Sequence, residues 1–436
     1  MASRPSRSHG PIFAGGAIAF GVGFFALAPY VFSTTYVRPL VAAITATSSP
    51  VAEVAPLPTV AHVKTPASVK GIYMSQCVVG TPSFRDSLVK LVDDTELNSI
   101  VIDIKDFTGK IAFPTDDPIL KDSVSDACGA HDMKEFVKKL HDKGIYVIGR
   151  ITVFQDPNYT KLHPEQSVQS KARPGEPWKD RKGLSFISSE AKPYWNYVVA
   201  LSKYAHDVVG FDELNYDYIR WPSDGDMKDV AYPAGIPRAE AIEHFWKHLY
   251  ENVHPTGAIM SADLFGYVTV LEDDLGIGQQ LERALPYFDY IDPMVYPSHY
   301  NNGFAGIANV NNDPYKVVHV SMVRAVERTI ASTTKVASLS ETPIMQTVTI
   351  PAHPSTSSGQ VIATTTEERA TGFYAKPSYP ANKMRPWLQS FDYPVPYTPA
   401  MVAAQIKANT DAGLNSYIFW DAANKYSALR QVVAAE

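Results

Sequence analysis

From about residue 69 to the C-terminus, the sequence alternates between strand-like and helix-like stretches. Such alternation is typical of parallel βαβ units, because each crossover helix returns the chain to the same end of the sheet. Eight strands with intervening helices favour a closed (β/α)8 TIM barrel, and no GxGxxG motif follows the first strand to indicate an open doubly wound sheet. The strand candidates are 70–76, 98–104, 145–153, 210–217, 257–263, 289–296, 386–392 and 415–420.

Helical periodicity occupies most of the intervals between these strands. Apolar residues recur at the i, i+3, i+4, i+7 spacing of an amphipathic helix near 133–140 and 242–249, and a third apolar stripe lies at 317–326. The stretch 335–380 interrupts this pattern because it is rich in Ser, Thr and Pro. We expect a long insertion there, before the seventh strand, that is partly disordered or draped over the barrel mouth.

The N-terminal region has the pattern of a membrane anchor. Residues 1–10 contain Arg4 and Arg7 but no acid, and residues 11–32 carry no charge. This run is long enough for a transmembrane helix, which needs about 20 residues, and longer than a signal-peptide core of about 7–15 residues. Positive charge before the run predicts a cytoplasmic N-terminus. We expect an uncleaved anchor at 11–32, a linker at 33–68 and an extracytoplasmic domain at 69–436, with a cleaved signal as the alternative.

Composition argues against several classes of protein. The formal charge of −6, with no Lys/Arg-rich block beyond the extreme N-terminus, gives nucleic-acid binding little support. There is no HExxH, P-loop or GxSxG motif, so we expect no cofactor or metal and no serine nucleophile. The two cysteines, Cys77 and Cys128, form no CxxC motif; in an extracytoplasmic domain they would be able to form one disulfide.

The fourth strand carries the most informative polar residues. Side chains alternate along a strand, so Glu213, Asn215 and Asp217 share one face. Three polar side chains on one face are costly to bury unless they are paired or line a solvated cleft. Asp217 lies nearest the carboxyl end, where barrel enzymes place their active sites. Arg220 would hold Asp217 ionised there, or the two would form a salt bridge that only closes the loop.

Other strand ends add ionisable and aromatic candidates. The fifth strand ends at Asp263, which is either an active-site acid or the cap of the next helix. In the second strand, Asp103 and Lys105 share a face and are candidates for an internal ion pair. The remaining candidates come from the last three strands and the loops after them: Asp292, Tyr296, His299, Trp387, Gln389 and Trp420.

Carboxylates with aromatic rings and no metal motif indicate glycosidic bond cleavage. That reaction needs one protonated carboxyl to assist the leaving oxygen and one ionised carboxylate to attack the sugar or activate water. Crowded carboxylates shift each other's pKa values apart, which provides this division. The aromatic content of 11% suits a sugar-stacking cleft, although aromatic residues also fill large cores.

The sequence also resembles a known family. The stretches KGIYMS, ELNSIVIDIKDFTG, GFDELNYDYIRWPSDG, SADLFG, YIDPMVYPSHY and AQIKANTDAGLNSYIFWDAANKY are similar to a bacterial family of TIM-barrel glycoside hydrolases, long catalogued as a domain of unknown function. The resemblance covers about residues 69–427. By distant similarity to amylase-like barrels, it implies that Asp217 is the nucleophile and Asp263 the acid. The sequence departs from amylases in having Asp where they have Glu at strand five, and in having no acid inside strand seven, where Asp392 comes only at the end.

We therefore expect a glycosidase that acts on a cell-envelope or extracellular polysaccharide, tethered to the membrane by its N-terminal anchor and without a nucleic-acid partner. Asp217 would be the nucleophile or base and Asp263 the general acid. One alternative is a carbohydrate-binding barrel without activity. Another is a structural envelope protein, in which Arg150, Arg220 or Lys105 neutralises the strand-end acids. The residues expected to contact substrate are Asp103, Lys105, Arg150, Glu213, Asn215, Arg220, Asp292, Tyr296, His299, Trp387, Gln389 and Trp420.

Overall fold

A closed barrel of eight parallel strands forms the centre of the protein. The computed structural model describes residues 60–233, 235–350 and 364–433. Around the barrel the strands follow their order in the sequence, and the last pairs with the first. All eight predicted strands and the TIM-barrel fold are confirmed. The strands are β1 (Lys70–Met74), β2 (Ser99–Lys105), β3 (Tyr146–Thr152), β5 (Glu213–Asp217), β7 (Ile259–Phe265), β8 (Tyr290–Met294), β12 (Trp387–Gln389) and β13 (Tyr417–Trp420).

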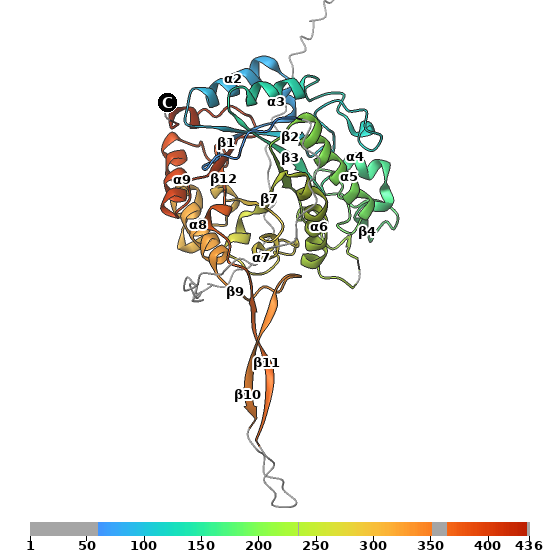
Figure 1. The fold of residues 1–436 in the computed structure, drawn as a ribbon, viewed down its shortest axis with the longest axis vertical. Helices are drawn as coiled ribbons and strands as arrows, with labels where there is room; N and C mark the ends of the chain where they lie inside the picture. Colours follow the sequence, from blue (N-terminus) through green and yellow to red (C-terminus); the bar gives the residue numbers. More distant parts are fainter. Residues whose placement is uncertain (1–59, 234, 351–363, 434–436) are drawn as a thin grey trace, which may run out of the picture.

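Helices surround this ring of strands (Figure 1). The apolar stripes predicted near 133–140 and 242–249 are buried against the barrel, as the helical period requires. Three of the helices begin with a side-chain cap followed by proline: Asp156 before Pro157, Asp313 before Pro314 and Thr398 before Pro399. The helices that follow successive strands are α2 (Pro82–Asp93), α3 (Met133–His141), α5 (Lys192–Tyr204), α6 (Arg238–Val253), α7 (Leu281–Ala284), α8 (Pro314–Ile330) and α9 (Pro399–Asp411).

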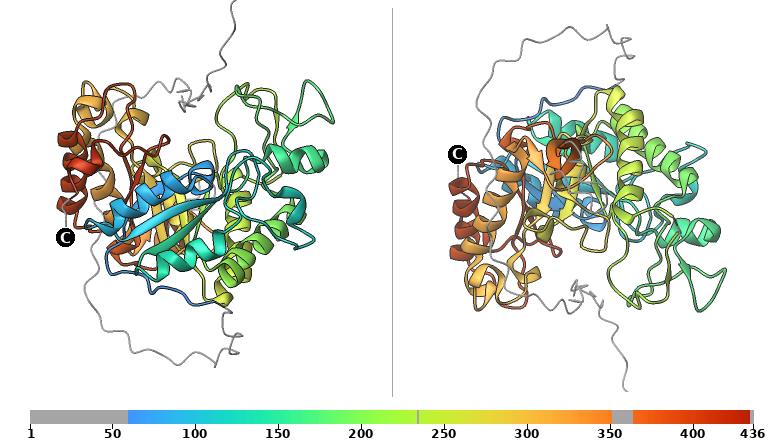
Figure 2. Two further views of the ribbon diagram at one scale, coloured as in Figure 1. Left: turned by 90° about the horizontal axis from the view of Figure 1, so that it is seen from above. Right: turned by 90° about the horizontal axis from the view of Figure 1, so that it is seen from below.

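The loops at the mouth of the barrel carry the shorter elements. The helix α1 (Gln76–Val79) follows β1, and α4 (Pro157–Leu162) follows β3. The short strands β4 (Gln169–Ser170) and β6 (Val230–Ala231) pair with each other and so join the loops after β3 and β5. The loops around α4 and β4 project at one side of the body (Figure 2).

Cys77 and Cys128 form a disulfide. It joins α1, which follows β1, to the loop after β2, and 51 positions of sequence separate the two cysteines. The disulfide that the sequence left open as an alternative is therefore present. It constrains two loops at the mouth of the barrel.

The segment 60–69 crosses the opposite, N-terminal end of the barrel. The Val63 N–H donates to Asp212 Oδ1 at 2.8 Å, and the Thr65 hydroxyl lies 3.2 Å from the Tyr146 hydroxyl. Asp212 directly precedes β5 and Tyr146 begins β3, so these contacts lie where the strands start. The expected membrane helix at 11–32 lies outside the described residues; within them, no helix has the length and apolar character to cross a bilayer.

The insertion at 335–380 contains an antiparallel hairpin that extends away from the body (Figure 1). Its strands β10 (Thr342–Ile350) and β11 (Thr365–Ala375) are largely exposed, and β9 (Thr333–Thr334) pairs with the base of β11. The prediction that this insertion covers the mouth is wrong. It connects α8 to β12, and a connection from a helix to the next barrel strand lies at the N-terminal end, opposite the mouth.

Candidate active site

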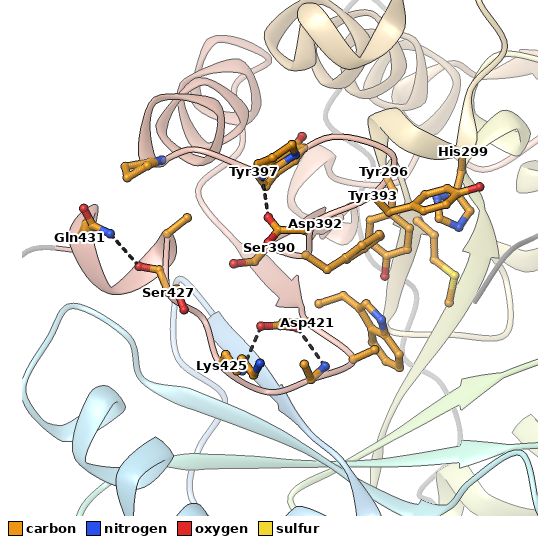
Figure 3. Close-up of a pocket in the computed structure, with 18 of the residues that line it drawn as sticks. Tyr296, His299, Ser390, Asp392, Tyr393, Tyr397, Asp421, Lys425, Ser427 and Gln431 are labelled. Atoms are coloured by element: carbon orange, nitrogen blue, oxygen red, sulfur yellow. Dashed lines mark hydrogen bonds between the residues drawn. The ribbon is translucent and has the colours of Figure 1, made fainter. Parts of the chain in front are cut away.

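A cavity of about 540 Å³ opens at the carboxyl end of the barrel strands. Arg150 of β3, Asp217 of β5, Met294 of β8 and Trp420 of β13 form the part that belongs to the barrel. Tyr218, directly after β5, and the loops that follow β8, β12 and β13 form the rest of its wall (Figure 3). The cavity therefore lies where the fold predicts an active site.

Arg150 lies at the centre of three carboxylates. Its Nη1 donates to Asp103 Oδ1 at 2.6 Å, its Nη2 pairs with Asp217, and its Nε lies 3.7 Å from Asp263 Oδ2. These carboxylates come from β2, β5 and β7. The structure thus brings Asp217 and Asp263 together around one guanidinium group, whose positive charge offsets part of their repulsion.

Asp217 is oriented by two donors. Besides Arg150, the backbone N–H of Tyr218 donates to Asp217 Oδ1 at 2.6 Å, and Tyr218 has a left-handed backbone with φ of 51°. The expected partner Arg220 instead donates to the Trp221 carbonyl and the Ser223 hydroxyl, and lies over the ring of Tyr218. The prediction of an Asp217–Arg220 bond is wrong, because the long side chain of Arg150 on the adjacent strand reaches Asp217 instead.

Asp263 is buried and has two unlike carboxyl oxygens. Its Oδ1 accepts from Asn215 Nδ2 at 2.8 Å and from Trp387 Nε1 at 2.7 Å. Its Oδ2 has no hydrogen-bond partner among the residues that the structure describes. Burial, and then the charges of Asp217 and Asp292, raise the pKa of Asp263 well above its ordinary value. Asp263 lies within β7, so it does not cap a helix.

A second cavity of about 20 Å³ lies between the two candidate catalytic residues. Asp217 and Asp263 both line it, together with Phe265 and Gln279. A cavity of this size holds about one water molecule. Asp217 lines both cavities, whereas Asp263 lines only the small one.

A fully buried ionic network lies beneath the site. Arg385 donates to Asp292 Oδ1 at 3.0 Å and to Glu213 Oε2 at 3.1 Å, and Asn215 Nδ2 lies 3.1 Å from Asp292 Oδ2. Burial raises the pKa of Asp292 to about 6, against the opposing effect of Arg385. Glu213, Asn215 and Asp292, which we expected to bind substrate, lie below both cavities and line neither. The sequence analysis did not single out Arg385, because it precedes its strand and the alternation of side chains along a strand does not apply to it.

Lys105 and Asp103 do not pair with each other, which corrects the expectation from the sequence. The register between β2 and β3 shifts between Asp103 and Lys105, so their alternation is broken. Lys105 Nζ lies 2.9 Å from Asp156 Oδ2 and 3.2 Å from the hydroxyl of Tyr194 in α5, whereas Asp103 is bound by Arg150. Burial raises the pKa of Asp103 to about 6.

The aromatic candidates separate into two groups. Trp420, Tyr296 and His299 line the main cavity, and burial lowers the pKa of His299 to about 4, so its imidazole is neutral near pH 7. The ring of Trp420 stacks on Tyr73 at 3.9 Å between ring centroids. Trp387 and Gln389 are buried and line neither cavity. Gln389 instead holds loops, since it accepts from Ser298 N–H and donates to the Tyr393 carbonyl.

The loops after β12 and β13 supply cavity residues to which the sequence analysis gave no role. Asp392, Tyr393 and Tyr397 follow β12, and Asp421 and Lys425 follow β13 (Figure 3). Asp421 shapes its loop because its carboxylate accepts the N–H groups of Ala423, Lys425 and Tyr426. The available signal was the run of polar and aromatic residues directly after each strand, where barrel loops carry function.

A parallel eight-stranded barrel with carboxylates and aromatic rings at its mouth has the architecture and side chains of a glycoside hydrolase. The chain belongs to the family described as "Putative glycosyl hydrolase domain", which matches residues 71–358 and 345–426. The resemblance inferred from the sequence is thereby confirmed.

A solved structure shares the barrel fold of this chain. The chain is similar to the glycoside hydrolase domain of PgaB (BpsB) from Bordetella bronchiseptica, with 14% identity over 85% of this chain and 100% of that one and a TM-score of 0.53. It is also 29% identical to a hypothetical protein from Ruminiclostridium thermocellum ATCC 27405, over 47% of this chain and 98% of that one, with a TM-score of 0.40. The likeness to PgaB shows a shared barrel fold. Among curated proteins, none matches the chain.

Proposed function

We propose that the barrel hydrolyses glycosidic bonds of a cell-envelope or extracellular polysaccharide, with Asp217 as nucleophile or base and Asp263 as general acid. One observation carries this proposal: two carboxyls from adjacent strands meet at one guanidinium group in unlike surroundings. Asp217 is at the wall of the open cavity and accepts charged and backbone donors. Asp263 is buried, and its raised pKa favours the protonated form that a general acid needs.

The two environments suit the two steps of the reaction. Arg150 and the Tyr218 N–H donate to Asp217 and orient its carboxyl, which would attack the anomeric carbon or activate water. The proton of Asp263 would pass to the departing glycosidic oxygen. An aspartate has a shorter reach than a glutamate, and one water molecule in the 20 Å³ cavity would bridge that gap.

The wall of the main cavity suits a carbohydrate. Its volume of about 540 Å³ lies within the range of small-molecule sites, and the rings of Trp420 and Tyr296 provide flat apolar surfaces for sugar faces. The disulfide between Cys77 and Cys128 suits an oxidising compartment outside the cytoplasm. Together with the uncharged run at 11–32, it supports a membrane-tethered enzyme whose substrate lies outside the cell.

The test is to incubate the full-length protein with a panel of polysaccharides and measure new reducing ends. We expect Asp217→Asn and Asp263→Asn each to lower the rate by about 10²–10⁴-fold, as expected for loss of acid–base catalysis. Asp411→Asn, on the exposed surface of α9, is the matched control. Equal product release by Asp217→Asn would remove Asp217 from the mechanism. The anomeric form of the first product, followed by NMR, distinguishes a nucleophile from a base.

One observation favours the alternative of a carbohydrate-binding barrel without activity. Arg150 neutralises both Asp103 and Asp217, as a site that holds but does not cleave a glycan would allow. The same panel separates the two functions. Retention of a polysaccharide by the full-length protein, without release of reducing ends, would support binding alone.

A further inference from the structure

Trp387 is a buried residue that bonds directly to the candidate acid. Its indole Nε1 lies 2.7 Å from Asp263 Oδ1. An indole N–H is only ever a donor, so Oδ1 of Asp263 must accept in this bond. The amide of Asn215 lies 2.8 Å from the same oxygen and also lies near Ser261 and Asp292. Two N–H groups thus converge on Oδ1.

The other oxygen of Asp263 is in a different situation. Oδ2 accepts no hydrogen bond within the described part of the chain, and its near neighbour is Arg150 Nε at 3.7 Å. A carboxyl oxygen that accepts two N–H groups is a poor site for a proton, whereas the free oxygen is available for one. Asp263 lines the small cavity that it shares with Asp217.

We propose that Trp387 is a positioning residue, which fixes the carboxyl of Asp263 by its indole N–H and so keeps the acid's proton on Oδ2. This inference rests on the proposed function, in which Asp263 is the general acid. Asn215 reinforces the arrangement from the neighbouring strand β5. Trp387 lines neither cavity, so it acts on the reaction through the residues that it contacts, and its hydrogen bond is to Asp263.

The surroundings of Trp387 hold its ring in place. It is fully buried in β12, where its backbone pairs with Met294 of β8 and Ile418 of β13. Its ring meets the ring of Trp420 edge to face, with 5.6 Å between centroids. Since Trp420 lines the main cavity, one aromatic pair supports both a wall of the substrate site and the acid beside it.

The test is to remove the N–H while keeping the ring. In the full-length protein, Trp387→Phe or replacement of Trp387 by its benzothiophene analogue deletes the donor; the analogue keeps the shape of tryptophan if phenylalanine impairs folding. Trp246→Phe is the matched control, because Trp246 is equally buried and its Nε1 has no hydrogen-bond partner among the described residues. The first probe is the infrared C=O band of protonated Asp263, assigned as the band that Asp263→Asn abolishes.

Loss of the donor should move the titration of this band upward by roughly one pH unit, because a hydrogen bond that stabilises the carboxylate is lost. The frequency of the band should also change, because the C=O oxygen loses a partner. Trp246→Phe should leave both unchanged. A band with the same frequency and titration in the Trp387 variants as in the wild type overturns the inference, and this measurement needs no enzymatic activity.

Catalysis gives a second readout once the panel has identified the sugar. With the polysaccharide, the Trp387 variants should lose roughly 10- to 100-fold in kcat/KM, whereas a dinitrophenyl glycoside, whose leaving group needs no proton, should lose little. An equal loss on both substrates would indicate a merely structural role and contradict the inference. If the wild type cleaves nothing, the proposed function fails, while the infrared titration still decides the role of Trp387.

Discussion

Glu213 and Arg385, which lie 172 positions apart in the sequence, form an ion pair that is fully buried inside the barrel. Arg385 pairs at the same time with Asp292, so one cation serves two carboxylates. Charged groups are tolerated at such a depth because each has a partner of opposite charge and further hydrogen bonds. The floor of the active site thus depends on one side chain that enters from the segment before β12.

Arg385→Met should destabilise the protein by about 3–5 kcal/mol, because it leaves two buried carboxylates without a cation. The deficit should grow as the pH rises, because burial raises the pKa of Asp292 to about 6 and its protonation relieves the repulsion between the two carboxyls only at low pH. Urea denaturation at several pH values measures this effect. Arg369→Met, in an exposed ion pair of the hairpin, is the control. Equal stabilities of the two variants would contradict the role assigned to the buried pair.

Asp292→Asn should shift the alkaline limb of kcat/KM to lower pH. The charge of Asp292 helps to raise the pKa of Asp263, and an acid with a raised pKa stays protonated to a higher pH. Asp292 has a pKa of about 6 and is therefore charged in the alkaline range. Removing that charge lets Asp263 lose its proton sooner. A pH–rate profile tests this prediction. The control is Asp289→Asn, because Asp289 directly precedes β8 and accepts the Met260 N–H of β7. A shift of the alkaline limb to higher pH would contradict the assignment of the acid.

Trp420→Ala should raise KM by roughly fivefold with a smaller change in kcat, because a stacking surface worth about 1 kcal/mol is removed from the cavity wall. Steady-state kinetics on the polysaccharide identified by the panel would measure this. Tyr315→Ala, on α8 outside the cavity, should leave KM unchanged. Should KM stay constant in Trp420→Ala, sugar would have to bind elsewhere on the wall.

Replacing Cys77 and Cys128 together by serine should lower the free energy of unfolding by about 4 kcal/mol, from the entropy of closing the loop between them. The disulfide lies outside the cavity wall, so activity at 25 °C should be retained. Thermal unfolding with and without reductant measures the effect. Reductant should lower the Tm of the wild type and leave that of the double variant unchanged.

Replacing residues 344–373 by an Asn-Gly turn should change the stability of the barrel by less than about 0.5 kcal/mol, because exposed residues contribute little. Both strands of this hairpin are largely exposed along their length. The turn would join Pro343 and Tyr374, which are paired in the present structure. Calorimetry and the reducing-end assay are the measurements. A large fall in Tm would show that the hairpin contributes to the core.

The fold was readable from the sequence because a TIM barrel repeats one local pattern eight times. Alternation along a strand also placed Glu213, Asn215 and Asp217 on one inward face, which their bonds to Arg385, Asp263 and Arg150 bear out. The same argument failed at Lys105, because a one-residue irregularity in β2 reverses which side a residue faces. The alternation of side chains predicts which way a residue faces only where the strand is regular.

The partners of the inward carboxylates could not be predicted, because they depend on long-range packing. Arg220 was the obvious candidate for Asp217 from its distance in sequence, yet Arg150 reaches it across the ladder between β3 and β5. Trp387 was expected to stack on sugar, but it lies within β12, and the cavity wall there is formed by residues that follow the strand. Composition and periodicity do not specify which residues of a strand are deep in the barrel and which line the cavity at its mouth.

The crossing of residues 60–69 beneath the strands of the barrel decides which way the enzyme would face. The described segment upstream of Val63 joins the body at the end of the barrel opposite the cavity, where Asp212 accepts the Val63 N–H. A tether on that upstream segment would therefore present the opening outward, toward material beyond the bilayer rather than toward its lipid. Such an enzyme would act on polysaccharide chains within a distance from the membrane that the length of its linker sets.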